Sequence, residues 1–74
     1  MTFGEIKRNL EELTKKEVKY DDKGLVFTIS NITYHLGYDG NNLVLTNDLD
    51  KSKMCASYSA IICAIKCILS NYSI

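Results

Sequence analysis

Apolar residues near the start of the chain repeat at the spacing of an α-helix. Residues three and four positions apart lie on one helical face, so the repeat predicts an amphipathic helix over the first sixteen residues or so. Thr2 and Glu5 have the spacing of a capping box, in which each side chain bonds a free backbone N–H of the first turn. The apolar positions are Phe3, Ile6, Leu10 and Leu13.

The middle of the chain has the alternating pattern of β-strands. Asp39-Gly40 is a strong signal for a tight hairpin. Gly24 supplies the backbone freedom that a turn over residues 21–24 needs. At Ser30-Asn31 either a tight turn or a bulge fits, and we favour a bulge because the inward-facing positions change phase between residues 29 and 32. The predicted strands are 17–20, 25–29, 32–38 and 43–46.

The last third of the chain, which includes "MCASYSAIICAIKC" at residues 54–67, predicts a second helix. Asp50 or Ser52 can cap it. At 100° per residue, the large apolar residues gather on one side and form the expected core face. This face holds Met54, Cys55, Tyr58, Ile61, Ile62, Ile65, Ile68, Leu69 and Tyr72.

These elements predict one domain over residues 1–74 in the α+β class. The expected order is α-β-β-(β)-β-α. It describes an antiparallel meander sheet of three or four strands with two helices packed on one face.

Composition narrows the function classes. The chain has nine basic and nine acidic residues, so its formal net charge is zero, whereas nucleic-acid-binding domains usually carry a basic excess. The longest apolar run, residues 60–65, is too short to span a bilayer, and the first residues do not look like a signal peptide. Three cysteines make an odd number, which does not suggest a disulfide framework. We therefore expect a cytoplasmic protein with no membrane partner.

Residues that could carry chemistry are few. Cys63 and Cys67 are one helical turn apart, but a zinc site needs about four ligands and only Cys55 and His35 are left to complete it. Cys55, near Lys53 at the expected helix start, is the best candidate for a reactive thiol. A cysteine–histidine pair stays open, because sequence does not show which residues are neighbours in space. We expect packing cysteines, no metal, no cofactor and no enzymatic activity.

The second helix has a second face made of small residues. Exposed helix faces usually carry charge, but Lys66 is the only charged residue after Lys53. Small side chains allow another backbone to approach closely, so this face predicts a protein interface, most simply with a second copy across a two-fold axis. Tyr38 and Asn41, at the predicted hairpin tip, are further interface candidates because tyrosine is enriched in interfaces. The predicted helical face consists of Ala56, Ser59, Ala60, Cys63 and Cys67.

The stretch "KSKMCASYSA" at residues 51–60 resembles the start of the second helix in double-stranded RNA-binding domains. The element order of this chain is also similar to that family. The resemblance implies that Lys51 and Lys53 contact phosphates, although Met54 and Ser57 replace two of the family's lysines. The matching positions are Ser52, Lys53, Ala56 and Ala60.

Small size, the lack of a catalytic set and a lysine-, asparagine- and isoleucine-rich composition resemble small phage and mobile-element proteins, including anti-CRISPR inhibitors. The leading expectation is a non-enzymatic protein-binding module, an inhibitor or adaptor that occupies the surface of a host defence or regulatory protein. The alternative is a nucleic-acid-binding domain of the double-stranded RNA-binding type.

Overall fold

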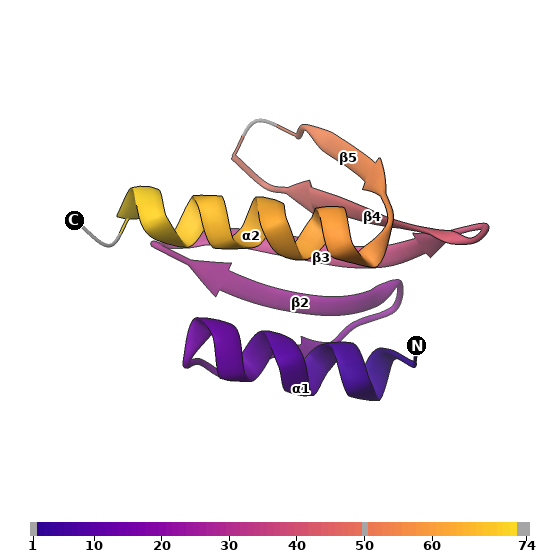
Figure 1. Ribbon diagram of the computed structural model, residues 1–74, viewed down its shortest axis with the longest axis horizontal. Helices are drawn as coiled ribbons and strands as arrows, with labels where there is room; N and C mark the ends of the chain where they lie inside the picture. Colours follow the sequence, from indigo (N-terminus) through magenta and orange to yellow (C-terminus); the bar gives the residue numbers. More distant parts are fainter. Residues whose placement is uncertain (1, 50, 73–74) are drawn as a thin grey trace.

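A five-stranded antiparallel sheet with two helices makes up the fold (Figure 1). The computed structural model describes residues 2–49 and 51–72. The elements, in chain order, are α1 (Phe3–Thr14), β1 (Lys19–Tyr20), β2 (Gly24–Ile29), β3 (Ile32–Asp39), β4 (Asn42–Asn47), β5 (Lys53–Ala56) and α2 (Tyr58–Tyr72).

The sheet is a meander in which every strand pairs with the strand before it, so the spatial order is β1-β2-β3-β4-β5. The α+β class and the antiparallel meander are confirmed. The number of strands is five, where the sequence predicted three or four. The Asp39-Gly40 hairpin is confirmed as well, since Asp39 pairs with Asn42 and Gly40 has a φ of 64°.

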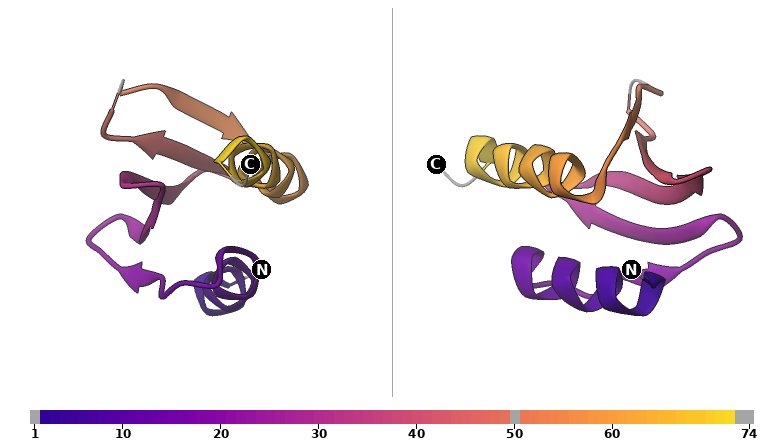
Figure 2. Two further views of the ribbon diagram at one scale, coloured as in Figure 1. Left: turned by 90° about the vertical axis from the view of Figure 1, so that its left-hand side faces the viewer. Right: turned by 45° about the vertical axis from the view of Figure 1, so that its right-hand side comes forward.

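Both helices cover the same face of the sheet, as predicted. Leu25, Leu36 and Leu45 are cross-strand neighbours on β2, β3 and β4, and all three side chains are buried. Ile6 and Leu10 of α1, with Ile61 and Ile65 of α2, join them in one core. Seen along the layers, the two helices lie on one side of the sheet, and the other face has no helix over it (Figure 2).

The start of α1 is set by local chemistry. The Glu5 backbone N–H donates to Thr2 Oγ1 over 3.3 Å, and the Thr2 backbone N–H donates to Glu5 Oε1 over 3.5 Å. This is the predicted capping box, which satisfies backbone donors that the first turn leaves free. Of the predicted apolar face, Ile6 and Leu10 are buried, while Phe3 and Leu13 pack against the core from its border.

The predicted start of the second helix is wrong. Residues 53–56 form β5, an edge strand in which Met54 pairs with Leu45 and packs against the core. The helix starts at Tyr58, and Ser57 caps it: its Oγ accepts from the Ala60 N–H over 3.4 Å. Met54 and Cys55 therefore belong to the sheet. Asp50, one of the two residues predicted to cap this helix, lies outside the described residues.

The predicted bulge at Ser30-Asn31 is also wrong. Both residues have left-handed φ values, 53° and 69°, and Ile29 pairs with Ile32 across them. Two such residues make the tight turn whose twist matches that of the flanking strands. The change of phase that suggested a bulge arises because the chain reverses there and the paired isoleucines face the same side.

Candidate functional site

Helix α2 is the most unusual surface element of the fold. Eleven of its fifteen residues are apolar, and Lys66 is its single charged residue. Of the α2 side chains that the structure describes, Ile61 and Ile65 are the two that are fully buried. Ile62, Ile68 and Leu69 pack against the core but stay partly accessible. The protein thus keeps a largely apolar helix at its surface.

The position of α2 explains this exposure. The helix packs over β4 and β5, at one side of the sheet, so a single stripe of its surface faces the core. Helix α1 lies over β2, and a hydrogen bond from Asn9 Nδ2 to Tyr58 Oη, 2.9 Å long, joins the two helices. Between them runs a shallow hollow lined by Asn9, Glu12, Leu13, Lys15, Tyr58, Ile62 and Lys66.

The structure brings together most of the small residues predicted as an interface. Ser59, Cys63 and Cys67 are exposed on successive turns of α2, with Ala60 half-buried beside them. We call these four residues the outer face of α2. Ala56 is a correction, since it lies on β5 and packs against the core from there.

The two predicted tip residues belong to a different part of the molecule. Tyr38 and Asn41 are exposed at the β3–β4 hairpin, which extends past the first turn of α2 (Figure 1). The Tyr38 ring packs on Phe3 of α1, with ring centroids 4.6 Å apart. The contact with Phe3 gives Tyr38 a structural role that does not depend on binding to another protein.

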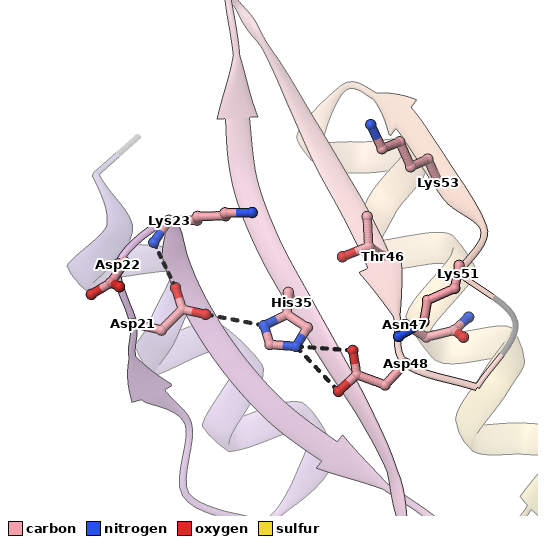
Figure 3. Close-up of a pocket in the computed structure, with 9 residues that line it drawn as sticks. All are labelled: Asp21, Asp22, Lys23, His35, Thr46, Asn47, Asp48, Lys51 and Lys53. Carbon is pink, nitrogen blue, oxygen red and sulfur yellow. Dashed lines mark hydrogen bonds and ion pairs between the residues drawn. The ribbon is translucent and has the colours of Figure 1, made fainter.

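On the helix-free face, His35 forms a polar cluster that sequence reasoning missed. His35 Nδ1 lies 3.0 Å from Asp21 Oδ2, and His35 Nε2 lies 3.3 Å from Asp48 Oδ1 (Figure 3). Asp21 follows β1, and Asp48 follows β4. The imidazole, in the middle strand, therefore connects two loops from opposite sides. We call this set of three residues the His35 bridge.

Backbone hydrogen bonds hold both acidic residues of the bridge, Asp21 through its carboxylate and Asp48 through its own N–H. Asp21 Oδ1 accepts from the N–H groups of Lys23 and Gly24, at 2.9 and 2.8 Å. The Asp48 N–H donates to the Thr33 carbonyl oxygen over 3.0 Å. These bonds leave Asp21 Oδ2 and the Asp48 carboxylate able to reach the imidazole.

The electrostatics of the bridge favour the charged imidazolium. The hydrogen bond to Asp21 raises the pKa of His35 above its ordinary value of 6.5; Asp48 adds to this effect, and partial burial opposes it. In return, the hydrogen bond with His35 lowers the pKa of Asp21 below its ordinary value of 3.8. When His35 is protonated, the bridge is an imidazolium between two carboxylates.

The His35 bridge bears on the two alternatives left open by the sequence, a cysteine–histidine pair and a zinc site. In the described part of the chain no nucleophilic side chain bonds His35, and Cys55 is two strands away on β5, with its Sγ 3.9 Å from Asp39 Oδ2. The two carboxylates lie on opposite sides of the ring and cannot converge on one ion. No group of three or more His, Cys, Asp or Glu residues suited to a metal occurs within residues 2–49 and 51–72.

The predictions made for the three cysteines need correction, first because Cys55 lies on strand β5. Cys55 does not lie at a helix N-terminus, so the reason for expecting a reactive thiol there is gone. Cys63 and Cys67 are exposed rather than packed in the core, contrary to the expectation of packing cysteines. All three are free thiols.

The lysines implied by the RNA-binding resemblance lie on the sheet side. Lys53 begins β5, and Lys51 precedes it with a left-handed φ of 60°. Together with Lys23 they border a hollow on the helix-free face that also includes Asp21, Asp22, His35, Thr46, Asn47 and Asp48 (Figure 3). They do not project from the start of a helix.

Comparison with protein-family models, with curated proteins and with solved structures gives no match for this chain. Among the described residues, neither helix has the length and apolar character needed to cross a membrane. The assignment of function therefore depends on the surfaces described above.

Proposed function

We propose that this protein is a small non-enzymatic protein-binding module, an inhibitor or adaptor that acts by covering a partner's surface. The observation that carries the proposal is the exposure of α2. A helix that is apolar on most of its circumference is normally buried, and a surface helix normally presents charged residues to water. Helix α2 has the apolar composition of a buried helix, but it lies at the surface.

A protein partner would remove this mismatch. The small side chains of the outer face of α2 let another backbone come close, and the partly accessible Ile62 and Ile68 can be buried further in such a contact. A helix of fifteen residues is about 22 Å long, and a standard interface covers about 800 Å² on each partner. The hollow beside α2 can therefore contribute to the same contact.

The simplest partner is a second copy of the chain, which would form a homodimer across a two-fold axis. A target protein, such as a host defence or regulatory protein, is the other occupant consistent with this surface. The small-phage-protein composition supports an inhibitor of the anti-CRISPR kind, acting in the cytoplasm.

Sedimentation under reducing conditions tests the proposal. We expect a concentration-dependent dimer, and we expect Cys63→Glu and Ala60→Arg each to weaken it at least about tenfold, because a charge would be placed in a dehydrated contact. Arg8→Glu is the matched control, since it places a new glutamate on an exposed site of α1. Circular dichroism checks that each variant folds.

A wild type that stays monomeric at high concentration would exclude the second copy as the partner. A dimer that survives both α2 substitutions with unchanged affinity would show that α2 is not the contact surface.

A nucleic-acid-binding role is the second candidate, favoured by the position of Lys23, Lys51 and Lys53 around one hollow. Asp21, Asp22 and Asp48 border the same hollow, so the charges balance locally as they do over the whole chain. For that reason we rank it below protein binding.

A further inference from the structure

The His35 bridge connects two segments that are far apart in the sequence. Asp21 lies in the turn between β1 and β2, and Asp48 lies in the loop between β4 and β5. His35 lies between them on β3, on the face that no helix covers (Figure 3). Among the described residues, these are the hydrogen bonds and ion pairs that connect this turn with this loop.

The two contacts depend on the protonation of the ring. A carboxylate accepts hydrogen bonds, so each contact needs an N–H on the nitrogen that faces it. The imidazolium has two N–H groups, but neutral imidazole has one N–H and one lone pair. When His35 loses its proton, one carboxylate must face a lone pair and its bond is lost.

The geometry indicates which bond is lost. Asp21 is the closer partner, at 3.0 Å, and two backbone N–H groups hold its carboxylate in place. Asp48 is 3.3 Å away, and its side chain is 56% exposed, compared with 26% for Asp21. Neutral His35 should therefore keep its proton on Nδ1 for Asp21 and turn a lone pair toward Asp48.

We propose that His35 is a pH-sensitive clamp that fastens the β4–β5 loop to the β1–β2 turn when protonated and releases the Asp48 side when neutral. Release is confined to the Asp48 carboxylate, because the Asp48 backbone stays bonded to Thr33 and the Leu49 N–H donates to Asn47 Oδ1 over 3.0 Å. The next residue, Leu49, is an exposed large apolar residue at 74% accessibility. The clamp lies on the opposite side of the sheet from α2 and is independent of the proposed function.

Other charged groups of both signs line the hollow around His35. Lys23 just before β2, Lys51 in the loop and Lys53 on β5 line the same hollow and oppose a positive charge on the ring. Asp22 lies in the hollow but has no bond to His35. The contacts with Asp21 and Asp48 outweigh the opposing effect of partial burial, and the pKa of His35 is raised.

Nuclear magnetic resonance tests the clamp directly, because His35 is the single histidine of the sequence. We expect its ring to titrate with a midpoint above 6.5, the ordinary value. The amide signals of Leu49 and Lys51 should shift with the same midpoint, because the Asp48 carboxylate beside them changes its contact.

Asp48→Asn separates the clamp from a general pH effect. A carboxamide accepts from the imidazolium and donates to the neutral ring, so the loop amides should lose their pH transition while the His35 midpoint falls. Asp22→Asn is the matched control and should change neither. A His35 midpoint at or below 6.5, or loop amides in the wild type that ignore the titration, would overturn the clamp.

Discussion

At the scale of single residues, His35 shows how an exposed polar side chain can stabilise a small sheet. The imidazole side chain is 35% exposed, so water screens its two ion pairs, and each is worth at most about 1 kcal/mol. The bridge nevertheless joins the β1–β2 turn to the β4–β5 loop, two segments that are far apart in the sequence. The contribution of the bridge to stability should depend on pH, because the pKa of His35 is raised and the pKa of Asp21 is lowered.

We expect His35→Ala to lower the free energy of unfolding by about 0.5–1 kcal/mol near pH 5. The pKa of His35 is raised, so its stabilisation is complete below 6.5 and disappears as the pH rises through the folded-state value. The pKa of Asp21 is lowered, so its stabilisation is present above 3.8 and disappears as the pH falls through the folded-state value. Urea denaturation of wild type and variant across this range measures the difference. A gap that is constant from pH 4 to pH 9 would contradict it.

At the scale of the elements, the boundary between β5 and α2 is set by a single residue. Ser57 separates the two elements, and its side chain caps the helix by accepting from the Ala60 N–H. The Ser57 carbonyl oxygen also accepts from the Ile61 N–H over 3.0 Å. Without the cap, the first turn of α2 would have one more unsatisfied donor, beside the fully buried Ile61.

We expect Ser57→Ala to destabilise the protein by about 1 kcal/mol, the usual loss when a serine N-cap is removed. Ser59→Ala, two residues later and exposed on α2, is the control and should be neutral or slightly stabilising because alanine favours helix. Thermal unfolding followed by circular dichroism measures both. Equal effects of the two substitutions would show that the helix does not start at Ser57.

At the scale of the whole molecule, the two faces of the sheet are used differently. One face supports both helices and contains the core, and the other is open and polar, as antiparallel sheets allow. The charged residues of the open face balance one another around the His35 bridge. Helix α2, with its mostly apolar composition, lies on the helical side.

We therefore expect weak binding to duplex RNA or DNA at physiological salt, with a dissociation constant well above the micromolar range. A chain with zero net charge releases few counterions on binding, so it gains little from phosphate contacts. A fluorescence anisotropy titration at several salt concentrations measures this. Submicromolar binding that falls steeply with salt, and that Lys53→Glu abolishes, would favour the nucleic-acid alternative.

Local signals in the sequence were enough for α1 and for most of the sheet. The Thr2–Glu5 capping box and the apolar repeat of α1 involve residues within a few positions of each other, and the structure confirms both. The Asp39-Gly40 turn and the alternation of β2, β3 and β4 are equally local. Such patterns predict an element because the backbone period and the turn chemistry act over a few residues.

Contacts between distant residues decided the rest. Met54 satisfies a helical repeat with Tyr58 and Ile61, but in the fold it gains a strand partner in Leu45, which no local pattern reveals. No local pattern links Asp21, His35 and Asp48, and pairing of β3 with β2 and β4 is what puts them side by side. Local patterns along the chain establish where helix and strand are favoured. Tertiary structure decided which of two favoured states residues 53–56 adopt and which polar groups meet, because both depend on burial and pairing between segments that only folding brings together.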